Sequence, residues 1–99
     1  MRKIVLACAA GASTSMLVLK MREAAQKAGY GCDIHAYPLS DVQDKAADAD
    51  IVLLGPQVRF QADKVSKLVN CPVEPIDTMM YGMMNGEGVI SHVKEVFGD

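Results

Sequence analysis

The stretch Cys8-Ala9-Ala10-Gly11-Ala12-Ser13-Thr14-Ser15 decides how the rest of this chain is interpreted. It follows the apolar run at residues 4–7 and precedes a helical pattern of apolar residues that starts at Met16. This order predicts a strand, a tight loop and a helix, with a thiol at the entrance of the loop.

The small residues of this stretch predict a site for an anion. They have no bulk to shield the backbone, so successive N–H groups can turn toward one ligand. The helix that follows adds unpaired N–H groups and the positive end of its dipole. Such a concavity suits a phosphate, and a cysteine beside it has a larger thiolate fraction. The alternative is a buried structural cysteine followed by an ordinary turn.

Length and composition, with 51% apolar and 22% charged residues, predict one soluble globular domain over residues 1–99. A net charge of -2 without a basic stripe argues against nucleic-acid binding. The apolar runs are too short for a membrane span or a signal peptide. Three cysteines without C-x-x-C spacing argue against a disulfide framework or a zinc site. We expect a cytoplasmic protein with reduced thiols and no cofactor.

Strand and helix patterns alternate four times along the chain. Strands are expected at 3–8, 32–36, 51–54 and 73–76, and helical segments at 13–28, 40–47, 57–68 and 88–97. This predicts an α/β three-layer sandwich: a four-stranded parallel sheet of order 2-1-3-4, flavodoxin-like, with helices on both faces. In such a sheet the strand order reverses between the first and third strands, so the loops that follow these two strands are neighbours. This places Cys8 beside Gly55, Pro56 and Gln57.

Local signals mark the ends of these segments. Ser13 or Thr14 is expected to cap the first helix and Ser40 the second. Gly29 is expected at the C′ position of the first helix. Neither His35, within a strand, nor His92, within the last helix, has an evident route to Cys8. Both are interpreted as partly exposed structural histidines.

Three motifs in the chain resemble one bacterial family, and they occur in the same order. They are residues 8–15, Ile51-Val52-Leu53-Leu54-Gly55-Pro56-Gln57, and Pro75-Ile76-Asp77-Thr78-Met79-Met80-Tyr81-Gly82. Together they resemble the enzyme IIB component of the sugar phosphotransferase system, of the lactose/cellobiose/chitobiose type. The resemblance covers nearly the whole chain.

The resemblance implies a phosphoryl carrier. Cys8 would accept a phosphoryl group from a phosphohistidine of enzyme IIA. It would pass the group to a sugar, such as cellobiose, chitobiose or lactose, held by the membrane enzyme IIC. The phosphate-binding residues would be Ala9, Ala10, Gly11, Ala12, Ser13, Thr14 and Ser15. We expect a monomer that docks transiently at the inner face of the membrane.

Gln57, Asp77 and Tyr81 are the candidates for the pocket rim or the partner surface. Gln57 either hydrogen-bonds a partner or the loop, or merely starts a helix, and the sequence does not decide between these. Asp77 is favoured as a helix cap over a direct contact with the phosphoryl site. Met79, Met80, Met83 and Met84 either form a soft partner surface or pack in the core, and core packing is favoured for at least two.

Two other functions fit a cysteine loop after a first strand. One is a low-molecular-weight cysteine phosphatase or arsenate reductase, and the other is a regulatory module that binds an anion or a protein. Small tyrosine phosphatases use C-x5-R followed by Ser or Thr. Here Thr14 occupies the arginine position and Ser15 the next one. The missing guanidinium argues against rapid hydrolysis, because it would stabilise the charge of the transition state.

Overall fold

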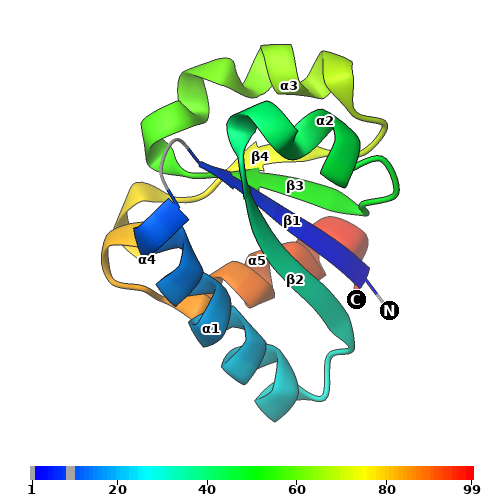
Figure 1. Ribbon diagram of the computed structural model, residues 1–99. Coiled ribbons are helices and arrows are strands. Elements are labelled where there is room, and N and C mark those ends of the chain that lie inside the picture. Colours follow the sequence, from blue (N-terminus) through cyan, green and yellow to red (C-terminus); the bar gives the residue numbers. More distant parts are fainter. Residues whose placement is uncertain (1, 9–10) are drawn as a thin grey trace.

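The computed structural model describes residues 2–8 and 11–99, and the side chains of α1 from residue 15 onward. The elements in chain order are β1 Arg2–Cys8, α1 Gly11–Ala28, β2 Cys32–Pro38, η1 Leu39–Asp41, α2 Val42–Lys45, β3 Ile51–Leu54, η2 Pro56–Gln61, α3 Ala62–Leu68, β4 Val73–Pro75, α4 Thr78–Gly82 and α5 Gly86–Phe97. The two η segments are 3-10 helices. Figure 1 shows how these elements are arranged.

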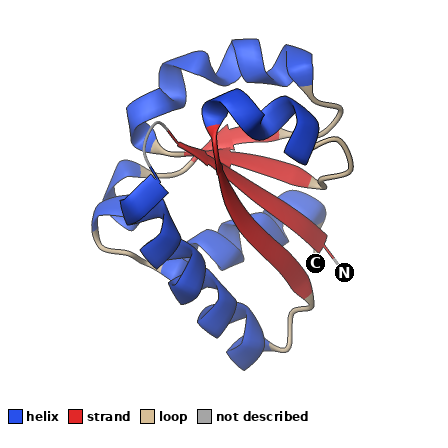
Figure 2. Cartoon of the chain, viewed as in Figure 1, coloured by secondary structure: helices blue, strands red, loops and turns tan. Residues whose placement is uncertain are grey.

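The four strands form one parallel sheet of order β2-β1-β3-β4, which confirms the predicted topology. Helices cover both faces of it: α1, α4 and α5 lie on one side, and α2 and α3 on the other (Figures 1 and 2). Because successive side chains of a strand point to opposite faces, β1 contributes to both cores. Ile4 and Leu6 pack with the α1 and α5 residues, whereas Val5 and Ala7 pack with residues of α2 and α3.

Several helix boundaries differ from the sequence prediction. The first helix begins at Gly11, so Ser13 and Thr14 lie in its first turn and the predicted cap is wrong. Ser40 caps no helix either, because Pro38 is the N-cap of η1 and Asp41 that of α2. The predicted helix at 57–68 is divided into η2 and α3. Gly29, with a φ of 65°, does follow α1 in the left-handed conformation that was predicted.

The last helix begins two residues before the predicted start. Asn85 is its N-cap, and the side-chain Oδ1 of Asn85 accepts a hydrogen bond of 3.0 Å from the backbone N–H of Gly88. Val89 and Val93 of this helix are buried. The sequence signal at 85–88 was therefore a cap preceding the helix, in agreement with the preference of Asn for this position.

A polar cluster joins residues near both chain ends at the amino-terminal end of β1, whereas Cys8 lies at its carboxyl end. Arg2 donates to the two carboxylate oxygens of Asp99 over 3.1 and 3.2 Å, and Tyr30 Oη donates to Asp99 Oδ2 over 2.6 Å. The Arg2 guanidinium also lies 4.1 Å from the centre of the Phe97 ring. Burial and the hydrogen bond to Asp99 together raise the pKa of Tyr30 to about 12.

The raised pKa of Tyr30 predicts a loss of stability at high pH. The unfolded chain ionises Tyr30 near its ordinary value of 10.0, before the folded protein does. The contribution is therefore fully present below pH 10 and is lost as the pH rises toward about 12. Urea unfolding of the wild type should show a steeper decline over this interval than unfolding of Tyr30→Phe. Parallel curves for the two proteins would contradict the assignment.

Candidate functional site

Cys8 is the last residue of β1, at the carboxyl edge of the sheet. It lies opposite Pro38 of β2 in the strand register and is 2% exposed. Its thiol is free. The backbone pairing continues past the strands here, because Gly55 N–H donates to Ala7 O over 2.9 Å. The predicted placement of Cys8 beside Gly55 is thus confirmed.

The Cys8 side chain and the Gln57 carboxamide both lie near the Cα of Gly55. An added Cβ at Gly55 would meet Gln57 Oε1 at 2.7 Å and Cys8 Cβ at 3.8 Å. The first distance is too short for a real contact, so the carboxamide occupies space that only glycine leaves open. The sequence predicts that the Cys8 and Gly55 motifs are neighbours, but nothing in it indicates that Gly55 leaves room for Gln57. A glycine directly after a buried strand was the available signal.

The amino end of α1 includes most of the stretch for which the sequence predicts an anion-binding loop. Of the predicted phosphate-binding residues, 11–15 belong to the helix, whereas Ala9 and Ala10 lie outside the described residues. Since α1 begins three residues after Cys8, its unpaired N–H groups are close to the thiol along the chain. Its first turn contains no acidic residue, so no carboxylate opposes the positive end of the dipole.

The other two thiols are partly buried beside carboxylates. Burial, reinforced by the Asp33 carboxylate, raises the pKa of Cys32. Burial and the Asp50 carboxylate do the same for the pKa of Cys71. A raised pKa keeps a thiol neutral and unreactive. Cys32 and Cys71 are therefore poorer candidates for a nucleophile.

Both histidines have carboxylate partners and lie away from Cys8. His35 Nε2 is 2.7 Å from Asp33 Oδ1, and in the sheet His35 lies beside Val5. His92 Nε2 is 2.7 Å from Glu74 Oε1 on the edge strand β4. Their predicted partial exposure is confirmed. Among the described residues, no group of His, Cys, Asp and Glu could hold a metal ion.

Asp77 is exposed and caps a helix, whereas Tyr81 is buried. Asp77 is the N-cap of α4, and its Oδ1 accepts a hydrogen bond of 2.7 Å from the Met79 N–H, as predicted. Tyr81 is 7% exposed and packs in the core shared by α1 and α5, so it contributes little to an exposed rim. The methionines divide evenly. Met80 and Met84 pack against that core, whereas Met79 and Met83 are 72% and 73% exposed.

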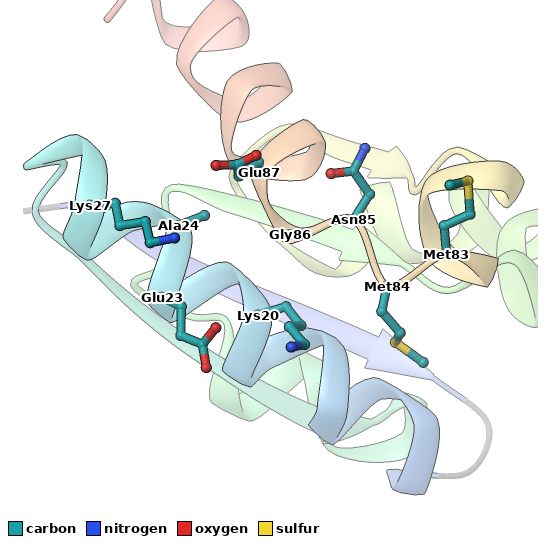
Figure 3. A pocket seen from close by; sticks show the side chains of 9 residues that line it. All are labelled: Lys20, Glu23, Ala24, Lys27, Met83, Met84, Asn85, Gly86 and Glu87. Atoms are coloured by element: carbon teal, nitrogen blue, oxygen red, sulfur yellow. The ribbon is translucent and has the colours of Figure 1, made fainter.

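The groove shown in Figure 3, of about 490 Å³, lies along α1 and the start of α5. Its lining on α1 begins at Lys20, more than two turns beyond Gly11, and does not include Cys8. Lys20 and Lys27 are accompanied by Glu23 and Glu87, so the groove has no dominant charge. A second hollow, of about 530 Å³, lies closer to the carboxyl edge, between Arg59 and residues 75–78. No helix within the described part of the chain is long and apolar enough to span a bilayer.

The sequence matches one known protein family over most of its length. Residues 3–92 match the family "PTS system, Lactose/Cellobiose specific IIB subunit". The chain is 43% identical to the oligo-beta-mannoside-specific EIIB component of Bacillus subtilis, over 88% of this chain and 87% of that protein. It is 41% identical to the galactose-specific EIIB component of Lactococcus lactis subsp. cremoris and to the cellobiose-specific component of subsp. lactis, each over 89% of both chains.

Two solved structures share the fold. The cellobiose-specific phosphotransferase IIB protein of Borrelia burgdorferi has a TM-score of 0.74 and 35% identity, over 91% of this chain and 85% of that one. The lactose-specific IIB domain of the phosphoenolpyruvate:carbohydrate phosphotransferase system (PTS) of Streptococcus pneumoniae has a TM-score of 0.83 over 95% of both chains. At 17% identity, the second likeness concerns the fold alone. From the family match and its close relatives, the chain belongs to the lactose/cellobiose-specific IIB subunits of the PTS.

Proposed function

We propose that this chain carries a phosphoryl group on Cys8 Sγ, between a phosphohistidine of enzyme IIA and a sugar held by the membrane enzyme IIC. The observation that carries the proposal is the free thiol at the end of β1, three residues before the amino end of α1. Family membership supports it, because the named relatives are sugar-specific components of the same system. The phosphate-binding groups would be the backbone N–H groups of residues 9–15.

The proposed reaction has two displacements at phosphorus. In the first, the Cys8 thiolate attacks the phosphoryl group, the S–P bond forms and the N–P bond breaks. The donor imidazole nitrogen leaves with its electron pair and takes up a proton. In the second, a sugar hydroxyl attacks, the O–P bond forms, the S–P bond breaks and the thiolate is restored. The hydroxyl proton passes to a base outside this chain. Phosphoryl transfer needs mainly positioning and charge stabilisation, which backbone N–H groups and a helix terminus can supply.

The sugar is proposed at the level of the family. The relatives of this chain are named for oligo-β-mannoside, galactose and cellobiose, so similar chains serve different sugars. We propose a sugar of the lactose/cellobiose type, selected by the membrane partner. The carrier would act in the cytoplasm as a monomer, and it would dock transiently at the inner face of the membrane.

Intact-mass analysis tests the carrier role. The protein is incubated with phosphoenolpyruvate and the purified upstream components, including enzyme IIA. We expect the mass to rise by one HPO3 group, and peptide mapping to place that group on Cys8. An unchanged mass, in a mixture where enzyme IIA itself is phosphorylated, would overturn the proposal.

A second prediction separates a carrier from a phosphatase. Thr14 stands where a C-x5-R loop has arginine, so no guanidinium is available to stabilise attack by water. Comparable arginines contribute roughly a thousandfold or more to phosphoryl transfer. We expect a phosphocysteine that is stable enough to isolate, together with negligible turnover of p-nitrophenyl phosphate. Rapid hydrolysis that disappears with Cys8→Ala would support the phosphatase alternative instead.

A further inference from the structure

We propose that Gly55 is a positioning residue, which holds the Gln57 carboxamide beside Cys8 so that this amide hydrogen-bonds the phosphoryl group on Sγ. The inference rests on the proposed function. It adds a residue that touches no substrate and acts only through Gln57.

The backbone of Gly55 does not itself require glycine. Its φ and ψ are -61° and 153°, an extended conformation open to any residue. Its N–H bonds Ala7 O over 2.9 Å, and its carbonyl accepts from Val58 N–H over 3.0 Å. Neither bond depends on the absence of a side chain. What requires glycine at this position is therefore the space around Cα.

That space is occupied by Gln57. A Cβ at Gly55 would be 3.7 Å from Ala7 O and 3.8 Å from Cys8 Cβ, both ordinary contacts. Only Gln57 Oε1, at 2.7 Å, would have to move. The methyl group of an alanine would therefore displace the end of one flexible side chain and leave the sheet edge intact.

The position suits a hydrogen bond to a phosphoryl group. Gln57 is exposed, and within the part of the chain that the structure describes its carboxamide has no hydrogen-bond partner. Its Nε2 carries two N–H donors. Hydrogen bonds to a charged acceptor are stronger than those between neutral groups. A donor held here would therefore stabilise the phosphocysteine and the transition states for its formation and breakdown.

The experiment compares wild type, Gly55→Ala, Gln57→Ala and the double variant in phosphoryl transfer from enzyme IIA. Gly31→Ala is the matched control, because a Cβ at Gly31 meets nothing within 4 Å. We expect each single variant to accept the group about tenfold to a hundredfold more slowly, as for one lost charge-assisted hydrogen bond. The double variant should be no slower than Gln57→Ala, since Gly55 acts only through that side chain. Gly31→Ala should match the wild type.

The side-chain NH2 signals of Gln57 give a second readout, which packing alone would not move. In the wild type they should shift when Cys8 is phosphorylated, and in Gly55→Ala this shift should be lost. Three results would each overturn the inference. They are a wild-type transfer rate in either single variant, additive losses in the double variant, and NH2 signals of Gln57 that do not shift when the wild type is phosphorylated. If wild-type Cys8 accepts no phosphoryl group at all, the proposed function fails instead. The two failures are thus distinguishable.

Discussion

Cys8→Ser is expected to fold and to accept no measurable phosphoryl group, a loss of at least about a hundredfold in transfer rate. An ordinary thiol is a few per cent ionised at pH 7, whereas a serine hydroxyl is barely ionised and is a far weaker nucleophile. The substitution changes one atom at a site that is 2% exposed, so packing is nearly unchanged. Labelling with radioactive phosphoenolpyruvate through the upstream proteins measures the effect.

The chain offers two matched controls for this substitution. Cys32→Ser and Cys71→Ser also replace sulfur with oxygen, but at thiols whose pKa is raised by burial and by a nearby carboxylate. Both should be labelled at the wild-type rate. Label retained by Cys8→Ser, or lost in either control, would show that the nucleophile had been assigned to the wrong cysteine. Thermal melting of all three variants checks that they are folded.

Gly86→Ala is expected to cause a large loss of stability. Gly86 is buried at the start of α5, against the middle of α1. An added Cβ would lie 2.4 Å from Lys20 C, 2.5 Å from Lys20 O and 2.6 Å from Met21 N. These are backbone atoms of a long helix, so relief requires the two helices to move apart. Overpacking of this kind costs about 3 kcal/mol, or roughly 10–20 °C in melting temperature.

Gly82→Ala is the control for that prediction. Gly82 ends α4, and a Cβ there would meet nothing within 4 Å. The change in unfolding free energy should stay below about 1 kcal/mol, the range of intrinsic helix preference. Similar melting temperatures for Gly86→Ala and the wild type would show that α1 and α5 yield easily at this contact.

The strands and their order follow from the sequence because their signal is local and strong. Ile51–Leu54 is apolar throughout and ends at Gly55-Pro56, and all four of its residues are buried in the sheet. The alternation of such runs with helical patterns permits few topologies. The sequence does not distinguish α-helix from 3-10 helix in the segments at 40–47 and 57–68, because one face of a short helix contains too few residues to separate the two geometries.

The candidate site divides in the same way. Cys8, the small residues after it and the cap at Asp77 are recognisable from neighbours along the chain. The burial of Tyr81 and the division of the four methionines are not. Their sequence spacing is compatible with either surface or core, and the choice depends on how α4 packs against α5 and the core.

By itself, the sequence determined the sheet order, the position of Cys8 at its carboxyl edge and the proximity of the Gly55 motif. Hydrophobic periodicity and connection rules contain that information. Only the tertiary structure decided that Gly55 leaves room for the Gln57 carboxamide and that Gly86 lies against the backbone of α1. A glycine has no side chain whose character reports its surroundings. The atoms that occupy the space beside it come from elements that only folding brings together.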